Sequence, residues 1–117
     1  MVCRRTDDLD WTPVTTDGAR ACYIRELLTA RDGAPTFAMR RFRVDPGGNT
    51  PLHSHPWEHE VFVLTGNATV KRDAEDVVLN AGDALLIMPN ELHSFVNAGA
   101  SPLEFLCMIP VEQVCCR

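Results

Sequence analysis

Short apolar runs along the chain alternate with polar positions, and Gly, Pro and Asn separate one run from the next. Because successive side chains of a strand point to opposite faces, this period of two predicts β-strands. We expect strands at residues 37–44, 60–65, 76–80, 84–88, 93–97 and 103–109. Residues 23–29 lack clear helical periodicity and are interpreted as a strand or strand-turn. Short strands at regular spacing are typical of an all-β sandwich or barrel.

Turn residues suggest how these strands follow one another. The cluster DPGG at residues 45–48 predicts that the strand 37–44 ends there. Gly66 and Asn67 follow the strand 60–65, so residues 67–73 are expected to return as the second arm of a hairpin.

The alternation also predicts which side chains face the interior. In residues 37–44, the more apolar face is made by Ala38, Arg40, Phe42 and Val44. In residues 103–109, a fully apolar face is made by Leu103, Phe105, Cys107 and Ile109. Both faces are expected to point inward, which would place a charged residue, Arg40, in or near the core.

Length and charge narrow the class of protein. A chain of 117 residues is expected to form one domain. The formal net charge of −5 argues against nucleic acid as a partner, since phosphate binding needs a surplus of Lys and Arg on one face. No apolar run approaches the ~20 residues that span a membrane, and no secretory signal is recognisable, so a cytoplasmic location is expected. Five cysteines without a CxxC spacing are expected to be reduced thiols.

The candidate chemistry lies in the histidines. Three of the four stand within seven residues, at His53, His55 and His59. Residues two apart in extended backbone project from one face, and neutral imidazole is a common ligand of transition metals. His93 follows a turn, stands at the start of a predicted strand and could complete the site from across the sheet. The alternative is a solvated, histidine-rich surface loop.

Two segments resemble the cupin motifs. The first, PGGNTPLHSHPWEHEVFVLTG, has Gly47, five residues and then the HxH of His53 and His55. The second, GDALLIMPNELHSFVN, has His93 followed after three residues by Asn97. Asn90 stands where the family's turn usually has Gly, and Asn tolerates the left-handed backbone that Gly would supply. The resemblance implies a jelly-roll barrel, the cupin double-stranded β-helix.

Two adjacent residues, His59 and Glu60, are candidates for the fourth metal ligand. The family's usual Glu position holds His59, while one family variant would instead use Glu60. We favour His59, because its distance to Gly66 fits the commoner spacing and it keeps the parity of His55. The sequence resembles the four-histidine cupins, which are associated with manganese.

The expected function follows from this resemblance. One divalent transition metal per chain is expected, with Mn favoured and Fe, Ni, Cu or Zn as alternatives. Four imidazoles would leave two positions of an octahedral ion open, as a dioxygenase acting on a small organic substrate requires. A non-catalytic small-molecule binder or sensor is the alternative. A metal-dependent isomerase or lyase is less favoured, since no general base is evident.

The remaining expectations concern the pocket, the partners and the domain limits. A tentative substrate pocket would be lined by Arg40, Phe105, Cys107 and Ile109. The partners would be a small molecule and, as is common in small cupins, a second copy joined through the outward face of Phe37 and Met39. The single domain is divided into an N-terminal arm with strands (residues 1–32), a barrel core (33–110) and a tail (111–117).

Overall fold

The computed structural model describes residues 1–111 and is built almost entirely of strands. Within that range it has β1 (Thr12–Pro13), β2 (Arg20–Leu28), β3 (Phe37–Asn49), β4 (His59–Thr65), β5 (Asn67–Lys71), β6 (Val77–Asn80), β7 (Ala84–Ile87), β8 (Ser94–Val96) and β9 (Leu103–Pro110). Two 3-10 turns, η1 (Thr6–Asp8) and η2 (Ala30–Asp32), lie in the N-terminal part. Every predicted strand is present, and residues 23–28 of the predicted segment 23–29 lie in β2.

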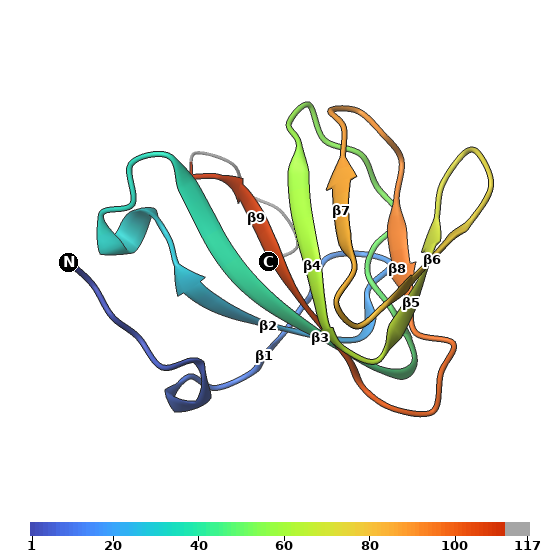
Figure 1. Cartoon of the computed structure of the whole chain (residues 1–117), viewed down its shortest axis with the longest axis horizontal. Helices are drawn as coiled ribbons and strands as arrows, with labels where there is room; N and C mark the ends of the chain where they lie inside the picture. The colour runs from blue at the N-terminus through green and yellow to red at the C-terminus, as the bar shows by residue number, and fades with distance from the viewer. Residues whose placement is uncertain (112–117) are drawn as a thin grey trace.

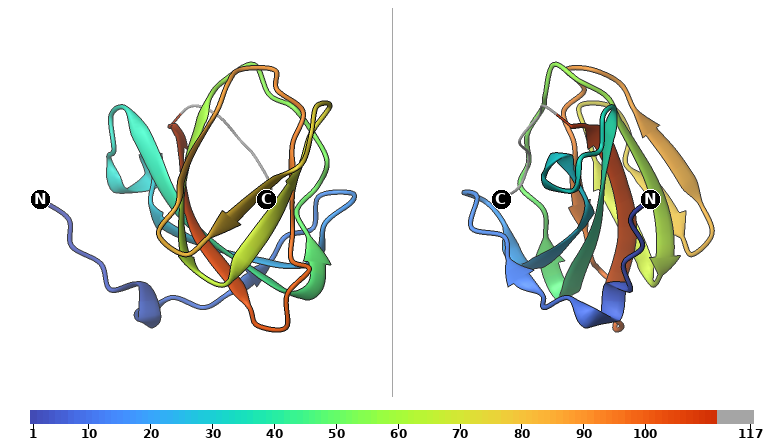
Figure 2. Two further views of the ribbon diagram at one scale, coloured as in Figure 1. Left: turned by 45° about the vertical axis from the view of Figure 1, so that its right-hand side comes forward. Right: turned by 90° about the vertical axis from the view of Figure 1, so that its left-hand side faces the viewer.

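The strands form one curled antiparallel sheet. Their order is β6-β5-β8-β3-β9-β4-β7, and β2, which carries β1, also pairs with β3. In Figure 1, β2, β3, β9 and β4 form one wall and β8, β5 and β6 the other. Figure 2 shows the two walls curving around a common interior. The prediction of an all-β jelly-roll barrel is confirmed.

The interior is made by the two faces expected from the alternation. Inward residues of β9 are almost completely buried, with Leu103 at 0% and Phe105 at 2% exposure. Opposite them on β3, Phe42 is 3% exposed and Arg40 2%. Each pairs directly across the two strands, Phe42 with Phe105 and Arg40 with Cys107. A buried guanidinium therefore stands within the barrel, as predicted.

The expected end of a strand at residues 45–48 was wrong, because β3 continues to Asn49. Cys22 pairs with Val44 and Arg20 with Asn49, so residues 45–48 together face the single residue Ala21 of β2. This is a large bulge, which bends a strand without ending it. A Cβ on Gly48 would lie 2.5 Å from the carbonyl oxygen of Arg20, so glycine is required there. Beyond the bulge, β3 reaches the second wall, where Asn49 pairs with Val96 of β8.

The expected hairpin of residues 60–65 and 67–73 was also wrong. β4 pairs with β7 and β9, whereas β5 pairs with β6 and β8. The two strands are consecutive but lie in different walls, and Gly66 between them has a φ of 76°. Gly66 therefore lies where the chain crosses from one wall to the other, and not in a hairpin turn.

Replacing Gly66 with alanine is expected to destabilise the protein more than Gly47→Ala. Both residues have left-handed backbone, which costs an alanine ~1–2 kcal/mol. Only at Gly66 would the new Cβ meet packed backbone, 2.6 Å from the carbonyl oxygen of Pro102, while none lies within 4 Å at Gly47. Urea unfolding of both variants checks this. Equal losses would show that the contact with Pro102 relaxes without cost.

The N-terminal segment is held against the barrel by charged contacts. The Arg4 guanidinium donates to Asp32 at 2.8 Å, and with the backbone N–H of Thr29 it lowers the pKa of that carboxyl to about 2. Arg25 of β2 lies 4.1 Å from the centre of the Trp11 ring.

Residues 112–117, with Cys115 and Cys116, lie outside the described residues. In residues 1–111 no helix has the length and apolar character needed to cross a membrane.

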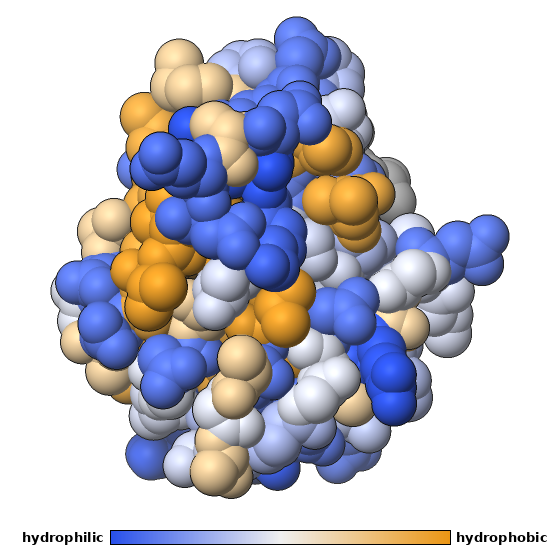
Figure 3. Space-filling view, turned by 90° about the vertical axis from the view of Figure 1, so that its right-hand side faces the viewer, coloured by the Kyte–Doolittle hydropathy of each residue, from blue (hydrophilic) through white to orange (hydrophobic). Residues whose placement is uncertain are grey.

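Several large apolar side chains are exposed. Phe37 is 70% exposed, and Met39 on the same face is half-buried. The surface expected for a homodimer is therefore accessible, and the dimer itself stays a prediction. On the side drawn in Figure 3, apolar residues form separate patches between hydrophilic ones rather than one continuous surface.

Candidate metal centre

Two of the four histidines are held opposite each other by the backbone. His53 lies between β3 and β4, and His93 directly precedes β8. The N–H of His53 donates to the carbonyl of His93 at 3.1 Å, and the N–H of His93 donates back at 3.0 Å. This isolated bridge places two residues, far apart in the sequence, at one point of the barrel.

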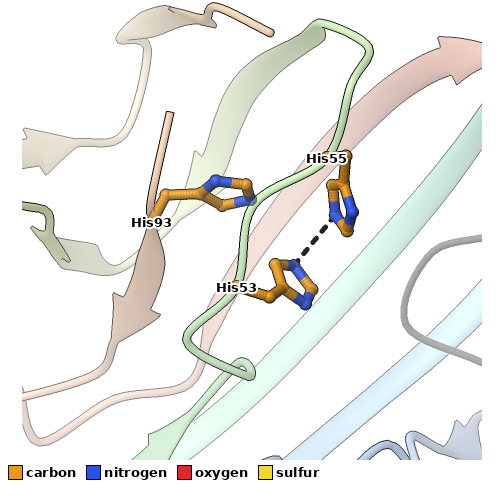
Figure 4. A group of neighbouring side chains, drawn as sticks. All are labelled: His53, His55 and His93. Carbon is orange, nitrogen blue, oxygen red and sulfur yellow. Dashed lines mark hydrogen bonds between the residues drawn. The ribbon is translucent and has the colours of Figure 1, made fainter. Parts of the chain in front are cut away.

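All four imidazoles gather at that point. The ring of His53 lies 4.2 Å from that of His55 and 5.0 Å from that of His93. The ring of His59 lies 4.9 Å from His55 and 5.1 Å from His93. Figure 4 shows the rings of His53, His55 and His93 turned toward one another, with His93 reaching in from the other wall. The four histidines that the sequence predicts as one group therefore lie together in the structure.

The separations fit a shared ion. The Nε2 atoms of His53 and His55 lie 3.1 Å apart, and the nearest ligand atoms of His53, His55 and His93 all lie within 4.8 Å of one another. Two nitrogens bound to one metal at ~2.1 Å are separated by about 3.0–3.4 Å. A group of three or four imidazole nitrogens is a suitable ligand set for a divalent transition metal.

Neighbouring groups orient the rings. The Nδ1–H of His93 donates to the carbonyl of Glu91 at 2.8 Å, which directs Nε2 away from that carbonyl. The ring of His55 is stacked on Trp57 at 4.6 Å with an interplanar angle of 4°. Such outer contacts fix the tautomer and orientation of metal-binding imidazoles. The stacking of Trp57 on His55 was not predicted from the sequence.

His59 and Glu60 point in opposite directions. His59 is 3% exposed and its Nδ1 lies 3.3 Å from the Sγ of Cys107, whereas Glu60 is exposed on the outer face of β4. His59 also lines the cavity shared with His53 and His93. The fourth ligand proposed from parity is thus on the inner side of the strand, and the competing carboxylate is on the outer side.

A small cavity of about 20 Å³ adjoins the imidazoles. It is lined by Arg40, Phe42, Thr50, His53, His59, His93, Phe95, Phe105 and Cys107. Three of the four residues proposed for the pocket, Arg40, Phe105 and Cys107, are among them. Ile109 is buried, but it lines a different pocket beside Phe37 and Met108. Its position two residues beyond Cys107 carries it past the cavity.

Sequence reasoning missed three lining residues. Phe42 was assigned to the inward face but not to the pocket. Phe95 follows His93 by two residues and shares its side of the chain, a parity signal that could have identified it. Thr50 carries no such signal, because its placement depends on the bulge; it is 4% exposed and its hydroxyl accepts from the N–H of Phe95.

Two curated relatives match part of the chain. An oxalate-binding protein of Thermotoga maritima is 36% identical over 70 residues, which cover 59% of this chain and 58% of the relative. A 1-methylthio-D-xylulose 5-phosphate methylsulfurylase of Rhodospirillum rubrum is 33% identical over 91 residues, which cover 76% of this chain and 56% of the relative. This chain therefore spans less than two thirds of the length of each of these relatives.

Solved structures match nearly the whole chain. The polyketide cyclase RemF of Streptomyces resistomycificus superimposes with a TM-score of 0.89 at 32% identity, over 95% of this chain and 80% of that one. A predicted oxalate decarboxylase of Thermotoga maritima superimposes with a TM-score of 0.82 at 25% identity, over 94% of this chain and 99% of that one.

The cupin domain family matches residues 40–109, which include all four histidines and both predicted motifs. The jelly-roll barrel and the structural relatives agree with this match. The chain belongs to the cupin family.

Proposed function

We propose that this cupin holds one divalent transition metal through His53, His55, His59 and His93, and that it is an enzyme acting on a small oxygen-rich organic molecule. The observation that carries the proposal is the convergence of four imidazoles, of which His53, His59 and His93 line one cavity. Burying imidazoles together is costly unless their lone pairs are satisfied, which a cation does. His59 and His93 are 3% and 4% exposed, which supports this reading over a solvated loop. Manganese is the ion we favour, from the resemblance to four-histidine cupins.

The chain's own residues define what would bind. Arg40, 2% exposed on the cavity wall, can donate charge-assisted hydrogen bonds to an anionic oxygen. Phe42, Phe95 and Phe105 give the cavity an apolar wall for a carbon skeleton. A volume of about 20 Å³ has room for a water-sized group, so only the reacting end of a substrate would enter. A divalent ion bound there would supply Lewis-acid polarisation of a substrate oxygen.

The favoured substrates carry two closely spaced oxygens. Oxalate has this arrangement, and polyketides carry carbonyls on alternate carbons. The names of the relatives above concern these two chemical classes. The match to a polyketide cyclase over 95% of this chain favours a ring-closing or related reaction of a dicarbonyl without oxygen consumption.

A dioxygenase, the reaction expected from the sequence, is the second candidate. The observation in its favour is the three-phenylalanine wall, which would admit dioxygen and an aromatic or enolic substrate. The nine described residues that line the cavity include no carboxylate, so any reaction that begins with proton abstraction, ring closure included, would need a base other than a carboxylate.

Arg40→Met is expected to weaken binding of oxalate to the manganese-loaded protein about tenfold to hundredfold, because a charge-assisted hydrogen bond contributes ~1.5–3 kcal/mol. Methionine keeps much of the apolar volume of the arginine side chain. Isothermal titration at matched manganese occupancy measures the change. Unaltered oxalate affinity would remove Arg40 from substrate binding.

Turnover distinguishes the reaction classes. The manganese-loaded protein is incubated with linear poly-β-ketones, flavonols and catechols, with and without dioxygen. Consumption of a poly-β-ketone without dioxygen supports the cyclisation reaction, and consumption that requires dioxygen supports the dioxygenase. Saturable binding without turnover under either condition would overturn the enzymatic role in favour of a binding protein.

A further inference from the structure

The sulfur of Cys107 lies between a proposed metal ligand and a buried cation. Its Sγ accepts a hydrogen bond from Nη2 of Arg40 at 3.0 Å, and it lies 3.3 Å from Nδ1 of His59. The three residues stand on three adjacent strands. Cys107 of β9 pairs directly with Arg40 of β3 on one side and with Val61 of β4 on the other, and His59 is two residues before Val61 on the same face.

The chemistry of these groups sets the direction of both contacts. A guanidinium can only donate. His59 engages the sulfur with Nδ1, so Nε2 is the nitrogen that can meet an ion in the cavity. A neutral imidazole that offers the lone pair of Nε2 carries its proton on Nδ1, and that N–H then donates to the sulfur. The sulfur would thus accept from both sides.

We infer that Cys107 is a positioning residue, which fixes the ring orientation and tautomer of His59 toward the metal and links that ligand to Arg40. The inference rests on the metal site proposed above. Within the described site, the ring of His93 is oriented in the same way, by the hydrogen bond from its Nδ1–H to the carbonyl of Glu91 at 2.8 Å. Sulfur is a weaker hydrogen-bond acceptor than a carbonyl oxygen, so the orientation of the His59 ring is held less strongly than that of His93.

The test compares two buried cysteines. Cys107→Val keeps a small apolar side chain in the barrel and removes the acceptor. Cys22→Val is the matched control, because Cys22 is 3% exposed like Cys107 and is held in the β2–β3 part of the core. Burial raises the pKa of the Cys22 thiol to about 12, so this control removes a neutral side chain.

The affinity for manganese alone is measured by competition with a fluorescent chelator, and the visible spectrum is recorded after loading with Co(II). Cys107→Val is expected to lose about tenfold to hundredfold in manganese affinity and to change the cobalt spectrum, as loss of an outer partner of a ligand does. Cys22→Val is expected to match the wild type in both. Cys107→Ser retains an acceptor and should recover part of the loss.

Nitrogen-15 NMR of the zinc-loaded wild type gives a measurement that needs no variant. A proton on Nδ1 of His59 supports the inference, and a proton on Nε2 overturns it. The inference also fails if Cys107→Val keeps wild-type affinity and spectrum while His59→Ala loses metal. A wild type that binds no metal would instead refute the proposed function.

Discussion

Replacing His59 with alanine is expected to lower the affinity for a divalent transition metal by more than ~100-fold. The loss of an outer partner of a ligand alone costs 10–100-fold, so the loss of the ligand should cost more. His59 is 3% exposed and its ring lies 4.9–5.1 Å from the rings of His55 and His93. Alanine leaves three imidazoles and an enlarged cavity. Elemental analysis and chelator competition on the purified variant measure the effect.

Glu60→Gln is the matched control, because Glu60 is the next residue of β4 and its side chain is exposed on the opposite face. The substitution keeps the size of the side chain and removes its charge. We expect metal content and affinity close to those of the wild type. If Glu60→Gln loses the metal and His59→Ala retains it, the assignment of the fourth ligand is off by one residue.

Phe105→Ala is expected to lower the free energy of unfolding by ~3–5 kcal/mol, the usual loss for a buried phenylalanine. Phe105 is 2% exposed and lies between two other rings, 5.3 Å from Phe42 and 4.7 Å from Phe95. Since domains of this kind are stable by about 5–15 kcal/mol, the variant would lose a large part of its stability. Urea unfolding of the metal-free protein measures this without a contribution from the ion.

Leu106→Ala provides the comparison for Phe105→Ala. Leu106 is the adjacent residue of β9, faces the outer side of the sheet and is half-buried. Its truncation should cost clearly less than that of Phe105. Equal losses in the two variants would contradict a core centred on the stacked phenylalanines of the inner face.

The strands and their inward faces could be predicted because period-two alternation is a local property of the sequence. The order in which strands pair could not be predicted in the same way. Gly66-Asn67 has the composition of a hairpin turn, yet β4 and β5 lie in different walls. The close approach of Gly66 to Pro102 is what distinguishes this crossing from a hairpin, and that contact joins residues far apart in the chain.

The DPGG segment, residues 45–48, likewise has the composition of a turn but does not end its strand. Its composition correctly marks irregular backbone, with a φ of 82° at Gly47. Whether irregular backbone ends a strand or bulges depends on the partners beyond it, and here Asn49 finds Val96 of β8. Asn90, which stands where the turn of the cupin motif usually has Gly, does adopt the left-handed backbone, with a φ of 65°.

The histidines could be predicted as a group because three share one short segment and the fourth stands in a recognisable motif. The pocket could be predicted only in part. Arg40, Phe105 and Cys107 follow from alternation, whereas Thr50 reaches the cavity after the bulge, and Ile109 has the same parity but lies too far along β9. Alternation assigns a side chain to a face, and its height along the barrel depends on register.

The central claim is that four imidazoles hold one metal ion. X-ray absorption spectroscopy of the purified protein, with the metal it retains from the cell, tests this most directly, since imidazole rings give characteristic scattering beyond the nearest ligand atoms. The account predicts one ion per chain with four imidazole ligands. Fewer than four imidazoles, or a protein without a stoichiometric ion that also fails to bind added manganese, would contradict it.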